Sequence, residues 1–197
     1  AVSVEMIDSA GGGATITLST GQQVTTGATL IATGSTYRRT GAPGESDLIG
    51  SGVHFCATCD GPFYKGAPEL VVLGAGNSGL EEGLFLTKFA EHVTVIDRSN
   101  AAAGSKILID KVSAHPQMTL QLNTTLVSFN ADDNGKLASL TFVDADGDES
   151  DLRATGTFVF IGLEPNTKWL NGTVDLDDRG FVVTDRMMST SVPGVFA

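Results

Sequence analysis

The segment LVVLGAGNSGLEEG constrains the fold of this chain more than any other stretch. A continuous apolar run, Leu70–Leu73, leads directly into the glycine-rich loop Gly74–Gly79, and apolar residues at helical spacing follow the loop. A continuous apolar run is typical of a parallel strand that is covered on both faces. The segment therefore predicts a strand, a tight glycine turn and a helix, which together begin a Rossmann-like α/β domain.

The glycines of this loop have the spacing G-x-G-x-x-G, which is typical of dinucleotide-binding folds. Gly74 permits the tight turn, Gly76 lets the backbone approach a pyrophosphate, and Gly79 lets helix and strand pack closely. The helix N-terminus offers N–H groups to the phosphates. The next strand, Val93–Ile96, ends in Asp97, about 20 residues after the loop, where a carboxylate can bond a ribose hydroxyl. We expect a dinucleotide site here; the alternative is a glycine-rich turn without a ligand.

The remaining pattern alternates strands and helices in the middle of the chain and is β-rich at both ends. Helices are expected over residues 77–90 and 107–112. Strands are expected over residues 2–6, 15–18, 28–32, 70–73, 93–96, 119–122, 126–129, 137–143, 151–160 and 181–183, with turns at 11–13, 134–135 and 146–147. The sequence thus predicts a central parallel sheet flanked by β-rich segments.

Both cysteines of the chain lie in the segment FCATCD, at Cys56 and Cys59, with Asp60 directly behind them. A zinc site lacks ligands, because there is no second cysteine pair and His54 is too near in sequence. Covalent haem attachment is excluded, because it needs a histidine directly after the second cysteine, where this chain has Asp60. A redox pair fits, because two thiols in one turn can form a disulfide, a helix start lowers a thiol pKa, and Asp60 can move a proton. Two inert buried thiols are the remaining alternative.

Two other groups of polar residues carry no predicted chemistry. Asp144–Asp148 resembles a calcium loop, but its glycine is misplaced and no glutamate stands at the twelfth position, so a hairpin tip is expected. His92 and His115 stand alone at predicted element boundaries.

Charge and hydropathy exclude several classes of partner. The formal net charge of −11 disfavours nucleic acid, because an acidic surface repels phosphates. The sequence contains no apolar run of membrane-spanning length and no signal peptide. A lone dithiol without a disulfide framework favours a cytoplasmic protein.

Several motifs together resemble the low-molecular-weight thioredoxin reductases and the related flavoprotein subunit of alkyl hydroperoxide reductase. The most specific are CATCDGPFYKG and GAGNSGLEEG. They are joined in the same order by ATG at 32–34, PGE at 43–45, IG with PNT at 161–167, and GVFA at 194–197. The resemblance covers most of the chain.

The resemblance implies a function for each matching residue. Cys59 is expected to face the flavin, Cys56 to exchange with the protein substrate, and Asp60 to donate a proton. The nucleotide site is expected to comprise Gly74, Gly76, Asn77, Ser78, Gly79, Asp97, Arg98, Ile161 and Gly162. No metal site is expected.

The resemblance also implies domains and cofactors. Residues 52–162 match an NAD(P)H-binding domain that carries the dithiol, and residues 1–51 and 163–197 match parts of an FAD-binding domain. The glycine loop that opens the FAD domain in this family is not in the chain, so little or no FAD is expected to copurify. Such reductases bind the 2′-phosphate of NADPH with three arginines. Of these only Arg98 is present in this chain, and the acidic Asp97 precedes it, so we expect NADH to be favoured.

The sequence-based hypothesis is a disulfide reductase that passes electrons from NAD(P)H through FAD to Cys59 and Cys56. The expected partner is a thioredoxin-like or peroxiredoxin-linked protein, and the resemblance allows a homodimer. The alternative hypothesis is a non-catalytic dinucleotide-binding module without flavin.

Overall fold

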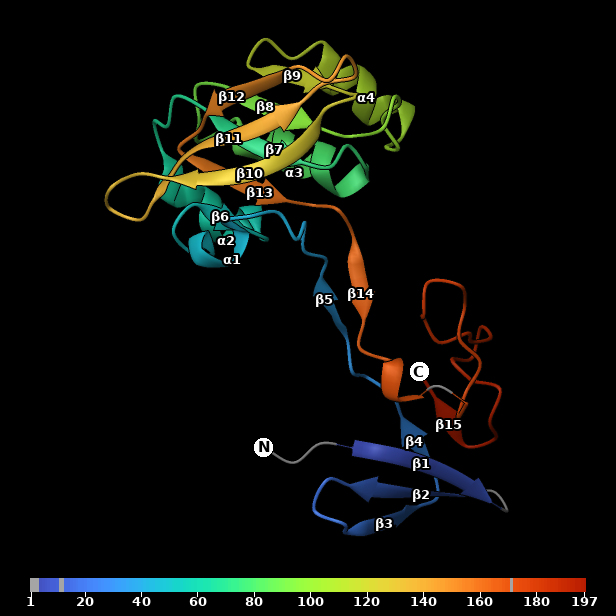
Figure 1. Cartoon of the computed structure of the whole chain (residues 1–197). Coiled ribbons are helices and arrows are strands. Elements are labelled where there is room, and N and C mark those ends of the chain that lie inside the picture. Colours follow the sequence, from blue (N-terminus) through green and yellow to red (C-terminus); the bar gives the residue numbers. More distant parts are fainter. Residues whose placement is uncertain (1–3, 11–12, 171) are drawn as a thin grey trace. The chain divides into compact units, whose positions relative to one another are not determined.

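The computed structural model describes residues 4–10, 13–170 and 172–197, and the chain divides into two compact units (Figure 1). One unit is Tyr37–Gly162. The other combines Ala1–Thr36 with Leu163–Ala197. The assignment of residues 1–51, 52–162 and 163–197 to cofactor domains stays a prediction.

The Tyr37–Gly162 unit is built on a five-stranded sheet in the order β6-β13-β7-β8-β9, and every pair in it is parallel. The strands are β6 (Val53–His54), β7 (Leu70–Leu73), β8 (Val93–Ile96), β9 (Met118–Gln121) and β13 (Gly156–Val159). All residues of β7, β8 and β13 are buried, as the apolar run at 70–73 predicted. The α/β fold with a central parallel sheet is confirmed.

Alternate residues of β7 reach two different layers, because side chains of a strand point to opposite faces. Leu70 and Val72 pack into a core with α3 (Asn77–Leu86) and α4 (Lys106–Ser113). Val71 and Leu73 pack into a second core with the antiparallel sheet β10-β11-β12, which covers the other face in Figure 1. Its strands are β10 (Thr125–Ala131), β11 (Leu137–Val143) and β12 (Glu149–Arg153).

Short helices complete this unit. They are α1 (Glu45–Leu48), α2 (Ala57–Asp60) and the 3₁₀ helix η1 (Gly61–Tyr64). Since α2 begins three residues after β6, it lies at the carboxyl edge of the parallel sheet, which is the edge where open α/β sheets bind ligands.

The second unit is mostly β-structure. Strands β1 (Val4–Ala10), β2 (Gly13–Leu18) and β3 (Gln23–Thr26) form an antiparallel sheet, and β4 (Thr29–Leu30) pairs with β15 (Val195–Phe196) in parallel. Strand β5 (Ser35–Tyr37) pairs with β14 (Leu163–Pro165), and the 3₁₀ helix η2 (Lys168–Leu170) follows. The core of this unit comprises Ile7, Ala14, Ile31, Leu170, Val174 and Val195.

Several expected elements differ from the structure. The run 151–160 is two strands, because the chain leaves the hairpin sheet after Arg153 and joins the parallel sheet at Gly156. The helix expected over 77–90 ends at Leu86. The strand expected over 28–32 is reduced to β4, whose Leu30 is 69% exposed, and residues 181–183 make a single bridge through Val182. Residues 2–3 and 11–12 of the expected strand and turn lie outside the described residues.

Candidate functional site

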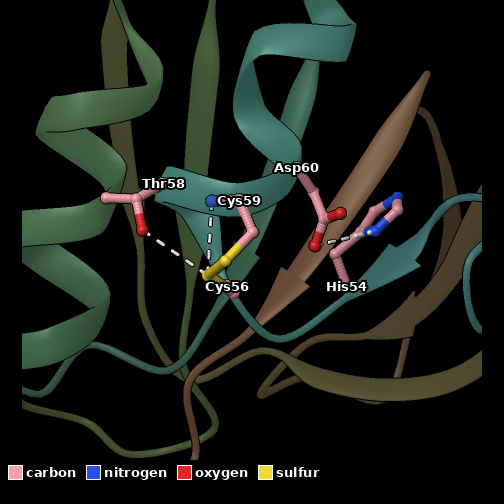
Figure 2. The surroundings of a disulfide bond; sticks show 5 residues. All are labelled: His54, Cys56, Thr58, Cys59 and Asp60. Carbon is pink, nitrogen blue, oxygen red and sulfur yellow. Dashed lines mark hydrogen bonds and ion pairs between the residues drawn. A yellow bond between two sulfur atoms is a disulfide. The ribbon is translucent and has the colours of Figure 1, made fainter.

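Cys56 and Cys59 form a disulfide at the N-terminus of α2, as the C-x-x-C spacing predicted (Figure 2). Cys56 has an extended backbone and is the N-cap residue, and Cys59 lies in the single turn that follows. Cys59 is exposed, whereas Cys56 is half-buried. We call Cys56, Cys59 and Asp60 the dithiol centre.

Two donors converge on the Cys56 sulfur. The backbone N–H of Cys59 donates to Cys56 Sγ at 3.2 Å, and the Thr58 hydroxyl oxygen lies 3.5 Å from the same atom. Figure 2 shows both contacts ending on the Cys56 sulfur. Hydrogen bonds to a charged form favour that form, so after reduction these donors stabilise a thiolate on Cys56.

Asp60 is paired with His54, which lies on the side away from Thr58 in Figure 2, and His54 in turn contacts Tyr64. Its carboxyl Oδ2 lies 3.3 Å from Nδ1 of His54, and His54 Nε2 lies 2.6 Å from the Tyr64 hydroxyl. The imidazole also packs on the Phe158 ring, with 5.3 Å between ring centroids. We call Asp60, His54 and Tyr64 the His54 cluster.

The His54 cluster is partly removed from water, and this changes its ionisation. Burial lowers the pKa of His54 below its usual value, although the Asp60 carboxylate pulls in the opposite direction. Burial, with a smaller contribution from the Asp60 charge, raises the pKa of Tyr64 to about 12. At neutral pH the cluster therefore has a neutral imidazole and a protonated phenol.

The glycine loop has the close approaches that its spacing predicted. Gly74 has a φ of 110°, and a Cβ on it would meet the backbone carbonyl of Phe160. A Cβ on Gly79 would meet the Gly74 carbonyl oxygen, so helix and strand pack without a side chain between them. A Cβ on Gly76 would meet no atom within 4 Å, and its φ of −79° suits any residue. The missing side chain of Gly76 thus serves no packing purpose within the protein.

The N-terminus of α3 points its first N–H groups out of the helix. The first intrahelical bond runs from the Leu80 N–H to the Gly76 carbonyl at 3.0 Å, so the N–H groups before Leu80 precede the ladder. The Asn77 side chain is already engaged, because its Oδ1 accepts from the Ser105 N–H at 2.7 Å. Asn77 therefore ties the start of α4 to the loop, and its backbone N–H and its side-chain Nδ2 are the donors that it can offer to a phosphate.

Asp97 lies at the end of β8 and holds the glycine loop through its carboxylate. Oδ2 accepts from the Ala75 N–H and Oδ1 accepts from the Ser99 N–H, both at 2.8 Å. Burial opposes ionisation of Asp97, but these N–H groups and the Arg98 charge outweigh it and keep the pKa of the carboxyl below its usual value. A negative charge is thus fixed beside the loop at neutral pH.

The last predicted site residues follow β13, the strand next to β7. A Cβ on Gly74 would lie 3.5 Å from Cγ2 of Ile161, which places Ile161 beside the loop. Gly162 has a φ of 105°, and its carbonyl accepts from the Arg38 N–H. The structure therefore brings Ile161 beside the glycine loop, at the carboxyl edge of the sheet.

Sequence analysis missed His54 and Tyr64. The only signal for His54 was its position two residues before Cys56, which does not show its partners. The interpretation of His92 as isolated was wrong: its Nδ1 lies 2.8 Å from Glu69 Oε2, and its Nε2 lies 3.1 Å from Thr119 Oγ1. Within the described residues, no group of three or more His, Cys, Asp or Glu side chains could hold a metal ion.

Comparisons with protein families, with curated proteins and with solved structures all find the same class of protein. Residues 2–197 match the family described as pyridine nucleotide-disulphide oxidoreductase. The chain is 38% identical to a thioredoxin reductase of Listeria monocytogenes over 170 residues, which is 86% of this chain and 53% of that protein. It is 41% identical to a thioredoxin reductase of Mycolicibacterium smegmatis over 172 residues, again 86% of this chain and 54% of the relative. The chain thus spans about half the length of these curated relatives.

Solved structures give the same result. The crystal structure of Lactococcus lactis thioredoxin reductase (FR conformation) superposes with a TM-score of 0.85 at 29% identity, covering 98% of this chain and 63% of that one. The T. acidophilum thioredoxin reductase also gives 0.85 at 29% identity, with 100% and 64% covered. No helix in the described part of the chain is long and apolar enough to cross a membrane.

Proposed function

Because the chain belongs to the pyridine nucleotide-disulphide oxidoreductase family, we propose that it carries the nucleotide site and the redox dithiol of a thioredoxin-reductase-type flavoenzyme. In this proposal, electrons from NAD(P)H reach the Cys56–Cys59 disulfide, and the resulting dithiol reduces a thioredoxin-like protein. The names of the curated relatives and of the similar structures support this class of activity.

One observation carries the proposal. The disulfide and the glycine loop lie in the same compact unit, and both follow strands of one parallel sheet at their carboxyl ends. Sites in open α/β sheets form at this edge. A dithiol and a dinucleotide loop on one edge suit the two ends of an electron path.

Each side chain of the dithiol centre has a proposed task. Cys56 is the thiolate that attacks the protein partner, because the Cys59 N–H and the Thr58 hydroxyl contact its sulfur. Cys59 completes the disulfide and receives electrons. Asp60 exchanges the proton that this chemistry requires. The proposed nucleotide site comprises Gly74, Gly76, Asn77, Ser78, Gly79, Asp97, Arg98, Ile161 and Gly162.

The residues present fit a dinucleotide. The open space at Gly76 admits a pyrophosphate, the first turn of α3 offers N–H groups, and Asp97 offers a carboxylate for the ribose. Bound NAD(P)H supplies a hydride, and FAD in the whole protein supplies the relay for its two electrons. The sequence has one G-x-G-x-x-G loop, which is assigned to NAD(P)H.

The proposed partner is thioredoxin-like. Phe63 follows α2 in η1 and is 84% exposed, so a large apolar side chain lies in the chain segment directly after the dithiol. The support for this partner class is the names of the relatives, which are thioredoxin reductases. A peroxiredoxin-linked partner, a homodimer and a cytoplasmic location stay predictions.

Redox competence tests the dithiol assignment. We expect two titratable thiols per chain after reduction and none after mild oxidation, because the C-x-x-C turn brings both sulfurs into bonding contact. Counting thiols over repeated cycles of oxidation and reduction measures this. Two thiols that persist under mild oxidation would exclude a redox function for this pair.

Nucleotide preference tests the assignment of Asp97. NADP(H) carries a 2′-phosphate, which would bring negative charge towards the Asp97 carboxylate, and we expect wild-type protein to bind NADH about tenfold more tightly than NADPH. In Asp97→Ala this ratio should approach one or reverse. Titration of both nucleotides by calorimetry gives the ratio.

The ratio of the affinities for NADH and NADPH tests the assignment of Asp97 more specifically than either affinity alone. Asp97 also holds Ala75 and Ser99, so its removal loosens the loop and weakens both nucleotides alike. Arg98→Ala is the matched control, since it removes the neighbouring positive charge and should increase the preference for NADH. Tighter binding of NADPH by wild-type protein contradicts the assignment.

A further inference from the structure

The geometry points to His54 as a positioning residue of the dithiol centre: its imidazole holds the Asp60 carboxyl on one side and the Tyr64 hydroxyl on the other, and so aligns the group that takes a proton from Cys59. This inference rests on the proposed function. It adds a residue that acts through Asp60 rather than on a substrate.

Hydrogen-bond donors and acceptors fix the direction of the chain of contacts. An ionised carboxylate only accepts, so Nδ1 of His54 must carry the proton that faces Asp60. Nε2 of a neutral imidazole then accepts, and the Tyr64 hydroxyl donates to it at 2.6 Å. Tyr64 thereby selects the tautomer that serves Asp60.

Packing keeps the imidazole in this orientation. The His54 side chain is only 10% exposed, and its ring lies against Tyr64 and Phe158, with centroid distances of 5.4 Å and 5.3 Å. Gly156 on β13 leaves space for the phenol, because a Cβ there would collide with the Tyr64 ring. Gly156 is the first residue of β13, and the close approach of Tyr64 accounts for a glycine at this position.

The charges around the ring are few. Asp60 on α2 and Tyr64 on η1 are the titratable groups that contact His54, and Phe158 on β13 is neutral. Since burial lowers the pKa of His54 and Tyr64 keeps its proton to about pH 12, the ring provides an N–H donor rather than a charge at neutral pH. The carboxylate of Asp60 is therefore oriented without being neutralised.

The position of the Asp60 carboxyl matters in the second step of thiol–disulfide exchange with the partner protein. The Cys56 thiolate attacks the partner disulfide, which forms a mixed disulfide and releases the partner's other sulfur as a thiolate. Cys59 then loses its proton to Asp60 and attacks Cys56, which forms the Cys56–Cys59 bond and releases the partner's second thiolate. Two electrons leave the dithiol for the partner disulfide, and Asp60 passes the proton on to the departing thiolate or to water. The first attack uses the Cys56 sulfur, which the Cys59 N–H and the Thr58 hydroxyl contact, and does not involve Asp60.

A small aromatic disulfide separates these two steps. Reduced protein mixed with 5,5′-dithiobis(2-nitrobenzoate) in a stopped-flow instrument releases one coloured thiolate on attack by Cys56 and a second on closure by Cys59. In His54→Phe we expect the second phase to slow about tenfold while the first keeps its rate.

Three further variants make the test specific. His54→Asn keeps a side-chain N–H near the position of Nδ1 and should restore most of the closure rate. Tyr64→Phe keeps the ring packing, removes the tautomer control and should slow closure about threefold. His92→Phe is the matched control, because His92 also bonds a carboxylate and a hydroxyl, at Glu69 and Thr119, and it should change neither phase.

Each outcome decides between the claims. If closure in His54→Phe keeps the wild-type rate, if His54→Asn closes as slowly as His54→Phe, or if both phases slow equally in His54→Phe and Tyr64→Phe, His54 does not position the proton acceptor. If wild-type protein shows no second phase, the dithiol itself does not exchange, and the proposed function fails instead.

Discussion

Replacing Cys59 by serine is expected to stop the reaction with an oxidised thioredoxin at the mixed disulfide. Cys56 keeps its donors, the Cys59 N–H and the Thr58 hydroxyl, so its thiolate still attacks. No second sulfur can then displace the partner, and turnover falls by a factor on the order of 10³ or more. A covalent adduct between the two proteins, seen by intact mass under non-reducing conditions, is the expected product.

The reciprocal variant distinguishes the two cysteines. Cys56→Ser removes the attacking sulfur, and among the described residues the two donors contact the Cys56 sulfur and not that of Cys59. We therefore expect no adduct with this variant. Because Cys59 is the more exposed of the two, the opposite assignment has a physical basis. An adduct formed by Cys56→Ser and not by Cys59→Ser would reverse the proposed order.

Gly76→Ala is expected to abolish tight nucleotide binding without disturbing the fold. A Cβ at Gly76 would meet no protein atom within 4 Å, and the backbone there has an ordinary extended conformation. The methyl group would instead occupy the space through which the loop approaches a pyrophosphate. We expect the affinity for NADH to fall about 100-fold, or roughly 2.7 kcal/mol, with the thermal unfolding midpoint unchanged.

Substitutions at two other glycines serve as comparisons for Gly76→Ala. Gly27→Ala is the matched control, because Gly27 also has open space around its Cβ but lies in the other unit, and it should leave NADH binding unchanged. Gly79→Ala should unfold the loop, since its Cβ would collide with the Gly74 carbonyl. Wild-type affinity for NADH in a folded Gly76→Ala protein would show that the nucleotide does not use this loop.

The sequence predicted the elements that carry a local signature. Leu70–Leu73 and the glycine loop form the expected strand and turn, because apolar runs and glycine spacing act within a few residues. β6 was not foreseen, and β13 was foreseen only as part of one longer strand. Two residues at Val53–His54 become a strand only because β13 lies beside them, and the run 151–160 gives no sign that its halves join different sheets.

The site residues, like the strands, were predictable only where the signal lies within a few residues of the chain. The Cys56–Cys59 pairing follows from one turn of chain and is present. The His54 cluster depends on β6, α2 and η1 coming together, so His54 and Tyr64, ten residues apart, gave no pattern to read. The Asp97 carboxylate was expected to meet a ribose, but its bonds to Ala75 and Ser99 show that it also holds the loop, a function that requires the fold to be seen.

Thiol transfer from the reduced wild-type chain to an oxidised thioredoxin tests the central claim most directly. The two proteins are mixed without other reductant, separated after acid quenching, and their thiols are counted individually. The account predicts that the chain loses two thiols, that thioredoxin gains two, and that the Cys56–Cys59 disulfide reforms. A chain that keeps both thiols in the presence of excess oxidised thioredoxin, while it still binds NADH, would contradict the account and identify a dinucleotide-binding module.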